Sequence, residues 1–163
     1  FGSFDDEKVI DSLKVSTIYE NMNFDSHEAA LQYEISDSGE NLSQGQKQLV
    51  SIARAVILQP KILLMDEATS NIDTKTDQTL QILIRRCFKT STVITIAHRL
   101  NTIVKYDKII ILGNGQVIEV GSPHDLLFDP KSIFYGYVME GGEDYLKEMQ
   151  ELLAKEDEHL EKK

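Results

Sequence analysis

The chain has 163 residues, of which 41% are hydrophobic and 27% charged, so it suits one ordinary domain and its composition excludes a wholly disordered protein. Its net charge of −10 argues against a general affinity for nucleic acid, and any bound phosphate is expected in residues 41–139, where eleven lysines and arginines face eight acids. The single cysteine, Cys87, excludes an internal disulfide, and no apolar run approaches the ~20 residues of a membrane-spanning helix.

The first forty residues predict short helices and a loop. Residues 5–14 should form a helix, because acids crowd the first turn, where the helix dipole favours them, and apolar residues share one face. Residues 16–34 predict one more short helix and a turn. Residues 35–42 are rich in serine, aspartate and glycine, which is typical of a loop.

A longer helix should begin after Ser43. This serine is a good N-cap, and Gln46 follows three residues later, as in a capping box. Apolar residues then recur at helical spacing until Pro60, which should end the helix. The serine hydroxyl, the amide of Gly45 and the helix N-terminus could together bind an anion, or Ser43 could simply cap the helix. The residues of this segment alone leave both interpretations open.

Two continuous apolar runs, 62–65 and 92–97, predict strands buried on both faces of a parallel sheet, with a helix at 74–88 between them. Asp66-Glu67 follows the first strand and His98 the second. In such sheets the chemistry collects at the carboxyl ends of the strands. One acid could hold Mg²⁺ and its neighbour could act as a general base, although acids also begin helices and a single histidine is often structural.

The last third predicts a short helix at 100–104 and a β-hairpin. A third strand at 108–112, a Gly-Asn-Gly turn and a fourth strand at 116–120 form that hairpin. Ser122-Pro123 should open another helix, with proline in its first position. Residues 143–163 are charged with one apolar stripe, which indicates either a solvated terminal helix or tail, or a helix that docks on a partner.

These motifs, taken in order and spacing, closely resemble the ATP-binding-cassette ATPases, and most of all the second nucleotide-binding domain of the multidrug-resistance-associated (C) subfamily of exporters. The resemblance implies an α/β fold, part of a P-loop NTPase (RecA-like) parallel sheet. It assigns residues 1–58 to the helical subdomain, 59–138 to the C-terminal half of the ATPase core, and 139–163 to a charged helix or tail. The matching segments are Leu42–Leu49, Ala53–Ala55, Pro60–Ser70, Asn71–Asp73 and Ile96–Leu100.

By this resemblance, the segment that begins with Ser43 is the family's signature loop, which contacts ATP bound to the facing domain of a head-to-tail dimer. Its contacting residues would be Ser43, Gln44, Gly45 and Gln46. Asp73 would lie in the D-loop, which links the two ATP sites of such a dimer.

The resemblance also implies the residues of hydrolysis. Asp66 would hold Mg²⁺, Glu67 would polarise the attacking water, and His98 would sense the γ-phosphate of ATP. The expected cofactors are therefore ATP and Mg²⁺.

One departure from the family pattern is important. A phosphate-binding loop needs a Gly-Lys pair within Gly-x-x-x-x-Gly-Lys-[Ser/Thr], and this sequence contains none. The family's adenine-stacking aromatic residue and glutamine loop would also precede Phe1, so we expect truncation upstream. The chain alone should then show negligible ATPase activity, and strands without their upstream partners should make it poorly soluble.

The leading hypothesis is that this is the C-terminal part of the nucleotide-binding domain of an exporter, which couples ATP binding and hydrolysis to transmembrane transport. Its partners would be a facing nucleotide-binding domain and transmembrane domains, on the cytoplasmic face of a membrane, with no nucleic acid. One alternative is a naturally truncated half-cassette that acts as a non-catalytic interaction or regulatory module. Another is a soluble cassette ATPase of the chromosome-maintenance type.

Overall fold

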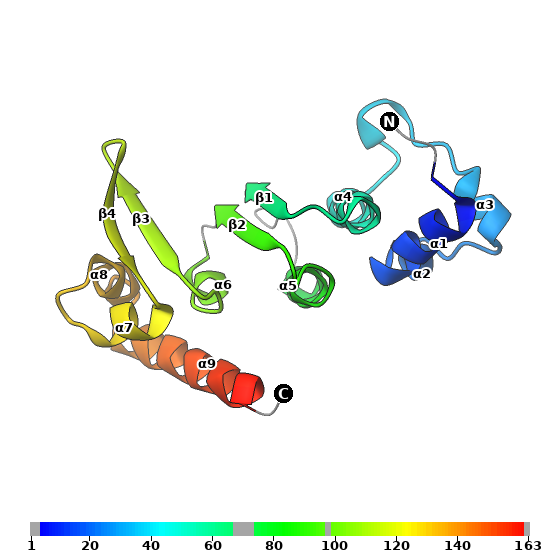
Figure 1. The fold of residues 1–163 in the computed structure, drawn as a ribbon. Helices are drawn as coiled ribbons and strands as arrows, with labels where there is room; N and C mark the ends of the chain where they lie inside the picture. Colours follow the sequence, from blue (N-terminus) through cyan, green and yellow to red (C-terminus); the bar gives the residue numbers. More distant parts are fainter. Residues whose placement is uncertain (1–3, 67–73, 97–98, 162–163) are drawn as a thin grey trace. The chain divides into compact units, whose positions relative to one another are not determined.

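Helices and strands follow one another in a mixed α/β order, which confirms the predicted fold class (Figure 1). In this computed structural model, residues 4–66, 74–96 and 99–161 are described. The chain divides into two units, Phe1–Ile96 and Ala97–Lys163.

The first unit opens with three short helices and a turn. The predicted first helix is α1, Asp6–Val15, whose N-cap is Asp5. Where the sequence predicts one further short helix, two are present, and Ser26 caps the second of them. These elements are α2 (Ile18–Asn21), α3 (His27–Leu31) and the 3₁₀ turn Asp37–Gly39.

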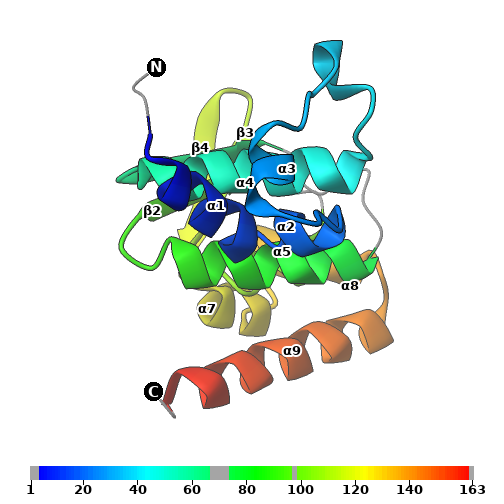
Figure 2. The same cartoon turned by 90° about the vertical axis from the view of Figure 1, so that its right-hand side faces the viewer.

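Two longer helices form the body of the first unit. They are α4, Gln44–Leu58, and α5, Thr74–Cys87, which lie side by side (Figure 2). As predicted, α4 ends just before Pro60, and Gln59 leaves it in a left-handed conformation with φ 46°.

A parallel pair of strands rests on these helices. β1, Ile62–Asp66, pairs with β2, Thr92–Ile96, from Ile62 opposite Thr92 to Asp66 opposite Ile96. One face of the pair packs against the apolar cluster that α4 and α5 form. The strand residues on this face are Leu63, Met65 and Val93, and the buried cluster beneath them consists of Ile18, Leu49, Ile52, Leu80, Leu83, Ile84 and Phe88.

The opposite face of the pair is exposed, so the prediction that both faces are buried is wrong for this chain. Leu64 is 72% exposed and Ile94 53% exposed, and their neighbours Ile62 and Ile96 are exposed too. A parallel sheet of this kind is normally covered on both faces. The apolar runs therefore predict strands that could be covered on both faces, but the residues that the structure describes cover only one face.

The second unit has its own core. The predicted hairpin is present as β3, Ile109–Gly113, paired antiparallel with β4, Gln116–Gly121. It packs with four helices around a buried cluster of Val104, Ile109, Leu126, Leu127, Phe134, Val138, Met149 and Leu153. The helices are α6 (Leu100–Ile103), α7 (Pro123–Phe128), α8 (Ile133–Met139) and α9 (Glu143–Glu161).

The terminal helix α9 packs on this core. Met149 is fully buried and Leu153 is 6% exposed, and both belong to the cluster that contains Phe134 and Val138. Up to Leu153, the apolar face of α9 is therefore occupied by the core of its own unit.

Helix α8 is the element that the sequence analysis missed, and a carboxylate from β4 holds its first turn. The amides of Ile133 and Phe134 donate to the Glu119 carboxylate at 2.9 Å each, and the Ser132 hydroxyl donates to it at 3.0 Å. Ser132 also accepts the Tyr135 amide at 3.3 Å. All the N-terminal amides of α8 that lack a helical partner are thus satisfied.

Replacing Glu119 by alanine should destabilise the second unit by about 2 kcal/mol, because two backbone amides and a hydroxyl lose a charged acceptor. Urea unfolding followed by circular dichroism measures this change. Glu151→Ala, an exposed position on α9, is the matched control and should shift the free energy of unfolding by less than about 0.5 kcal/mol. Equal stability of the two variants would contradict a structural role for the carboxylate.

Replacing Leu64 and Ile94 together by lysine should reduce self-association of the chain without unfolding it, since both side chains lie on the exposed face. Light scattering measures the association and circular dichroism the fold. Leu63→Lys, on the packed face, should instead unfold the first unit, because it buries an unpaired charge. If the double variant unfolds as readily as Leu63→Lys, the assignment of the two faces is wrong.

Candidate functional site

The N-terminus of α4 is closed by a reciprocal capping box, as predicted. The Gln46 amide donates to Ser43 Oγ at 3.2 Å, and the Ser43 amide donates to Gln46 Oε1 at 2.9 Å. The Lys47 amide donates to the Ser43 carbonyl at 2.9 Å, which starts the regular helical bonding. Ser43 therefore acts as a structural cap.

The capping box does not use the first two backbone amides of α4. Among the residues that the structure describes, no acceptor is recorded for the amides of Gln44 and Gly45, which are the first two of α4. Ser43 Oγ accepts one bond and keeps its own proton available. Ser43 and Gln44 are exposed to solvent. Capping and anion binding are thus compatible at this helix end, because they use different atoms.

Helix α8 shows what such an end can hold. There, the hydroxyl of the cap, Ser132, and the first two amides, of Ile133 and Phe134, all donate to one carboxylate, that of Glu119. The cap oxygen of Ser132 meanwhile accepts the third amide, as Ser43 does in α4. The two helix ends share one donor arrangement. In α8 an anionic side chain occupies these donors, and at α4 none of the residues that the structure describes does so.

Gln46, the last expected signature residue, uses both ends of its side chain within the fold. Its Oε1 accepts the Ser43 amide, and its Nε2 donates to Asn21 Oδ1 at 3.1 Å. The second bond ties the end of α2 to the start of α4. Sequence reasoning did not identify Asn21, because nothing in the local pattern connects it to a residue twenty-five positions away.

Asp66 ends β1 opposite Ile96, with its side chain exposed at the carboxyl end of the strand pair. An exposed carboxylate at such an edge suits Mg²⁺, which keeps most of its waters and needs only one or two carboxylates. Glu67, Asp73 and His98 lie outside the described residues, so their predicted places stay predictions. Over residues 4–66, 74–96 and 99–161, no three metal-binding side chains gather at one point.

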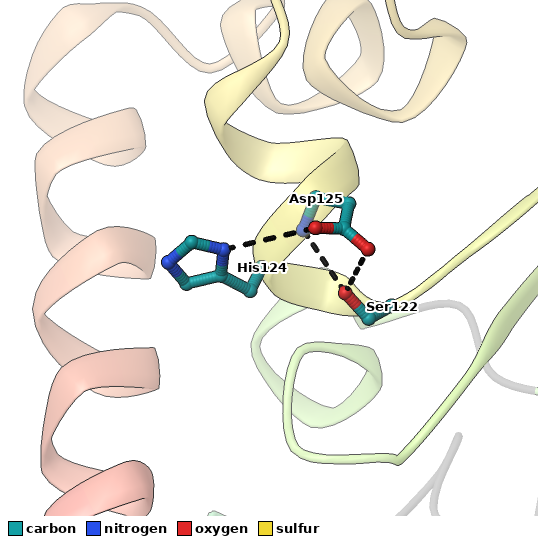
Figure 3. A network of polar contacts seen from close by, with 3 residues as sticks. All are labelled: Ser122, His124 and Asp125. Atoms are coloured by element: carbon teal, nitrogen blue, oxygen red, sulfur yellow. Dashed lines mark hydrogen bonds and ion pairs between the residues drawn. The ribbon is translucent and has the colours of Figure 1, made fainter.

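Ser122, His124 and Asp125 form a polar group of another kind (Figure 3). Ser122 caps α7 by accepting the Asp125 amide at 3.0 Å, and its hydroxyl donates to the Asp125 carboxylate at 2.8 Å. His124 Nδ1 lies 4.0 Å from that carboxylate, and both side chains are mostly exposed. The serine proton goes to the aspartate and not to the histidine, so this group caps a helix and is not a catalytic triad.

Cys87 is a poor candidate for a nucleophile. Burial raises the pKa of its thiol, and the nearby Arg86 offsets this only in part. The thiolate is the reactive form of cysteine, so a raised pKa makes the side chain less reactive near neutral pH.

Comparison with known proteins shows a family match over the segment that includes α4 and β1. The ABC transporter family matches residues 5–70. Three similar relatives are the metal resistance protein YCF1 of Saccharomyces cerevisiae, ATP-binding cassette sub-family C member 3 of Homo sapiens and the bile pigment transporter 1 of S. cerevisiae. Their sequences are 45%, 44% and 50% identical to this chain over 141, 142 and 117 residues.

These matches cover 86%, 87% and 72% of this chain but only 9%, 9% and 7% of the respective relatives. The chain therefore spans a small part of the length of the proteins that it resembles, and the similarity extends beyond residue 70.

Replacing Ser43 by alanine should destabilise α4 by about 1 kcal/mol, since the Gln46 amide loses its acceptor, whereas Ser43→Asp should keep a cap of similar strength. Urea unfolding measured by circular dichroism tests both. Ser51→Ala, in the interior of the same helix, is the control and should change stability by less than about 0.5 kcal/mol. An alanine effect no larger at Ser43 than at Ser51 would argue against the capping role.

Proposed function

Since this chain belongs to the ABC transporter family, as part of a nucleotide-binding domain of the C-subfamily type, we propose that the N-terminus of α4 binds the terminal phosphate of an ATP molecule held by a facing nucleotide-binding domain. In the complete protein, binding and hydrolysis of ATP at such sites would drive export across a membrane. The transmembrane domains of the transporter would be its second partner.

The donor arrangement at the start of α4 carries this proposal. Gln44 and Gly45 would contribute amides and Ser43 a hydroxyl, and at α8 the same set of two amides and one hydroxyl holds the Glu119 carboxylate. A phosphate oxygen is an acceptor of the same charge, and the dipole of the fifteen-residue helix α4 favours it further. Gly45 has no side chain, which leaves room for a phosphate to approach the backbone.

The remaining chemistry would belong to the ATP site of the chain's own complete domain. Asp66 would hold Mg²⁺ through its exposed carboxylate, Glu67 would orient and deprotonate a water, and His98 would contact the γ-phosphate. Asp73 would contact the facing domain. The bound Mg²⁺ would supply charge neutralisation of the phosphates.

The residues of this chain do not complete that site, because no Gly-Lys pair for a phosphate-binding loop occurs in its sequence. We therefore expect no ATP hydrolysis from the chain alone. No described helix is both long and apolar enough to cross a membrane. Attachment to the cytoplasmic face of a membrane would come through other parts of the transporter.

The relatives' names include metal resistance and bile pigment transport. On these names rests our proposal that the complete transporter exports a substrate.

A binding assay tests the proposal. The partner is a complete nucleotide-binding domain of the ABC transporter family that carries its own phosphate-binding loop, with the glutamate at the position of Glu67 changed to glutamine so that bound ATP persists. The chain should associate with it in Mg²⁺-ATP and not in Mg²⁺-ADP. Ser43→Asp should weaken association at least about tenfold, because it removes a hydroxyl donor and places a carboxylate at the phosphate position.

Ser51→Ala is the control and should bind as the parent chain does. Association that is equal in ATP and ADP, and indifferent to Ser43→Asp, would overturn the proposal and favour the non-catalytic interaction module. Measurable ATP hydrolysis by the pure chain would contradict the expected incompleteness of its own site.

A further inference from the structure

We propose that Asn41 is a positioning residue for the phosphate-binding end of α4. Its side-chain amide holds the preceding loop, residues 33–41, in one closed conformation, and this fixes the direction from which the chain enters Ser43. The inference rests on the proposed function of that helix end and adds a residue to which the family resemblance assigned no role.

The Asn41 amide uses its full bonding capacity. Its Oδ1 accepts the Ser36 amide at 3.1 Å and the Ser36 hydroxyl at 3.0 Å. Its Nδ2 donates to Tyr33 Oη at 3.1 Å and to the Glu34 carbonyl at 2.9 Å. An asparagine side chain has two acceptor positions and two donors, so none remains. One side chain thereby joins three positions of the loop.

The backbone of Asn41 adds a reciprocal hydrogen bond to Ser36. Its amide donates to Ser36 Oγ at 3.1 Å, so Ser36 both gives and receives a hydrogen bond with the same residue. Between them the chain turns through Ser38 and Gly39, both in the left-handed region with φ 58° and 65°. Such a turn needs outside bonds to persist, since a serine with positive φ is disfavoured.

Two further contacts tie this closed loop to α4. Lys47 Nζ donates to the Ser38 carbonyl at 3.0 Å, from the first turn of the helix to the tip of the loop. Leu42, the residue between Asn41 and Ser43, is only 8% exposed, so its buried side chain anchors the chain between the loop and the helix. The position of Ser43 therefore depends on the loop that Asn41 closes.

Burial does little to hold this loop. Tyr33 is 38% and Ile35 52% exposed, and the remaining residues of 33–41 are exposed or half-buried. Polar contacts must therefore supply most of its order. Donors that recognise a phosphate work only when they are held close to the productive geometry. A loop held mainly by one amide should lose this alignment when the amide is removed, while the helix itself remains folded.

The test uses the whole chain with three variants that leave its charge unchanged, which are Asn41→Ala, Ser36→Ala and the double variant. The readouts are hydrogen exchange of the hydrogen-bonded amides within 42–46, which are those of Leu42, Ser43 and Gln46, and ATP-dependent affinity for the facing domain used above. Asn41→Ala should speed exchange at these amides and weaken affinity by about tenfold, with far-ultraviolet circular dichroism unchanged. Asn101→Ala, an exposed asparagine on α6, is the control and should change neither readout.

The double variant separates positioning from direct contact. If Asn41 acts through Ser36, the double variant should be no weaker than the weaker single variant, because both remove one shared network. Additive losses of affinity, with exchange at 42–46 unchanged, would overturn the inference, since Asn41 would then touch the partner itself. Parent-like behaviour of Asn41→Ala in both readouts would overturn it too.

Failure of the proposed function would give a different experimental result. If the parent chain shows no ATP-dependent association, the proposed function fails, and hydrogen exchange alone decides whether Asn41 holds the loop. Faster exchange at 42–46 in Asn41→Ala would then still support the positioning role, and unchanged exchange would refute it.

Discussion

The packing of one sheet face on two helices is the constraint on which the first unit depends. Leu63, Met65 and Val93 fix β1 and β2 against α4 and α5, and the turn at Gln59 and Pro60 returns the chain from helix to strand. The helix that presents the candidate phosphate-binding end and the strand that ends at Asp66 therefore share one hydrophobic core. The candidate functional residues Ser43 and Asp66 lie at the ends of elements whose central residues form the core.

One helix end can be a cap and a binding site together because the cap uses the third amide and the site uses the first two. Helix α8 shows the structural outcome, and we propose the binding outcome for α4. At α8 a carboxylate from the neighbouring strand occupies the first two amides, which makes that end structural. At α4 the cap serine is arranged in the same way. The Gln46 side chain bonds to the Ser43 amide and to Asn21, and so leaves the first two amides of the helix without an acceptor among the described residues. What distinguishes the two ends is the presence of a carboxylate, not the geometry of the helix.

Local chemistry decided how much could be predicted. Helix α4 was predictable because its start, Ser43 with Gln46, and its stop at Pro60 are neighbours in sequence. Helix α8 was not, since Ile133, aromatic residues and a glycine have poor helix propensity and its stabilising partner lies on β4. The burial of β1 was predicted wrongly because an apolar run shows that a strand could be covered on both faces, and not which faces find a cover. The hydrogen bonds of Asn41 were not predicted for a related reason, because the residues that it bonds become its neighbours only after the loop folds.

The bonds from Glu119 to α8 also bear on the order in which the second unit can form. The carboxylate and the amides that it binds are 14 and 15 residues apart, and β4 lies between the hairpin turn and the helix. A helix of seven residues with weak propensity is unstable in isolation, so we expect α8 to gain its first turn after the hairpin has placed Glu119. Folding of this unit should therefore proceed in the direction of synthesis, with the hairpin acting as the template from which α8, and then the core face for α9, is built.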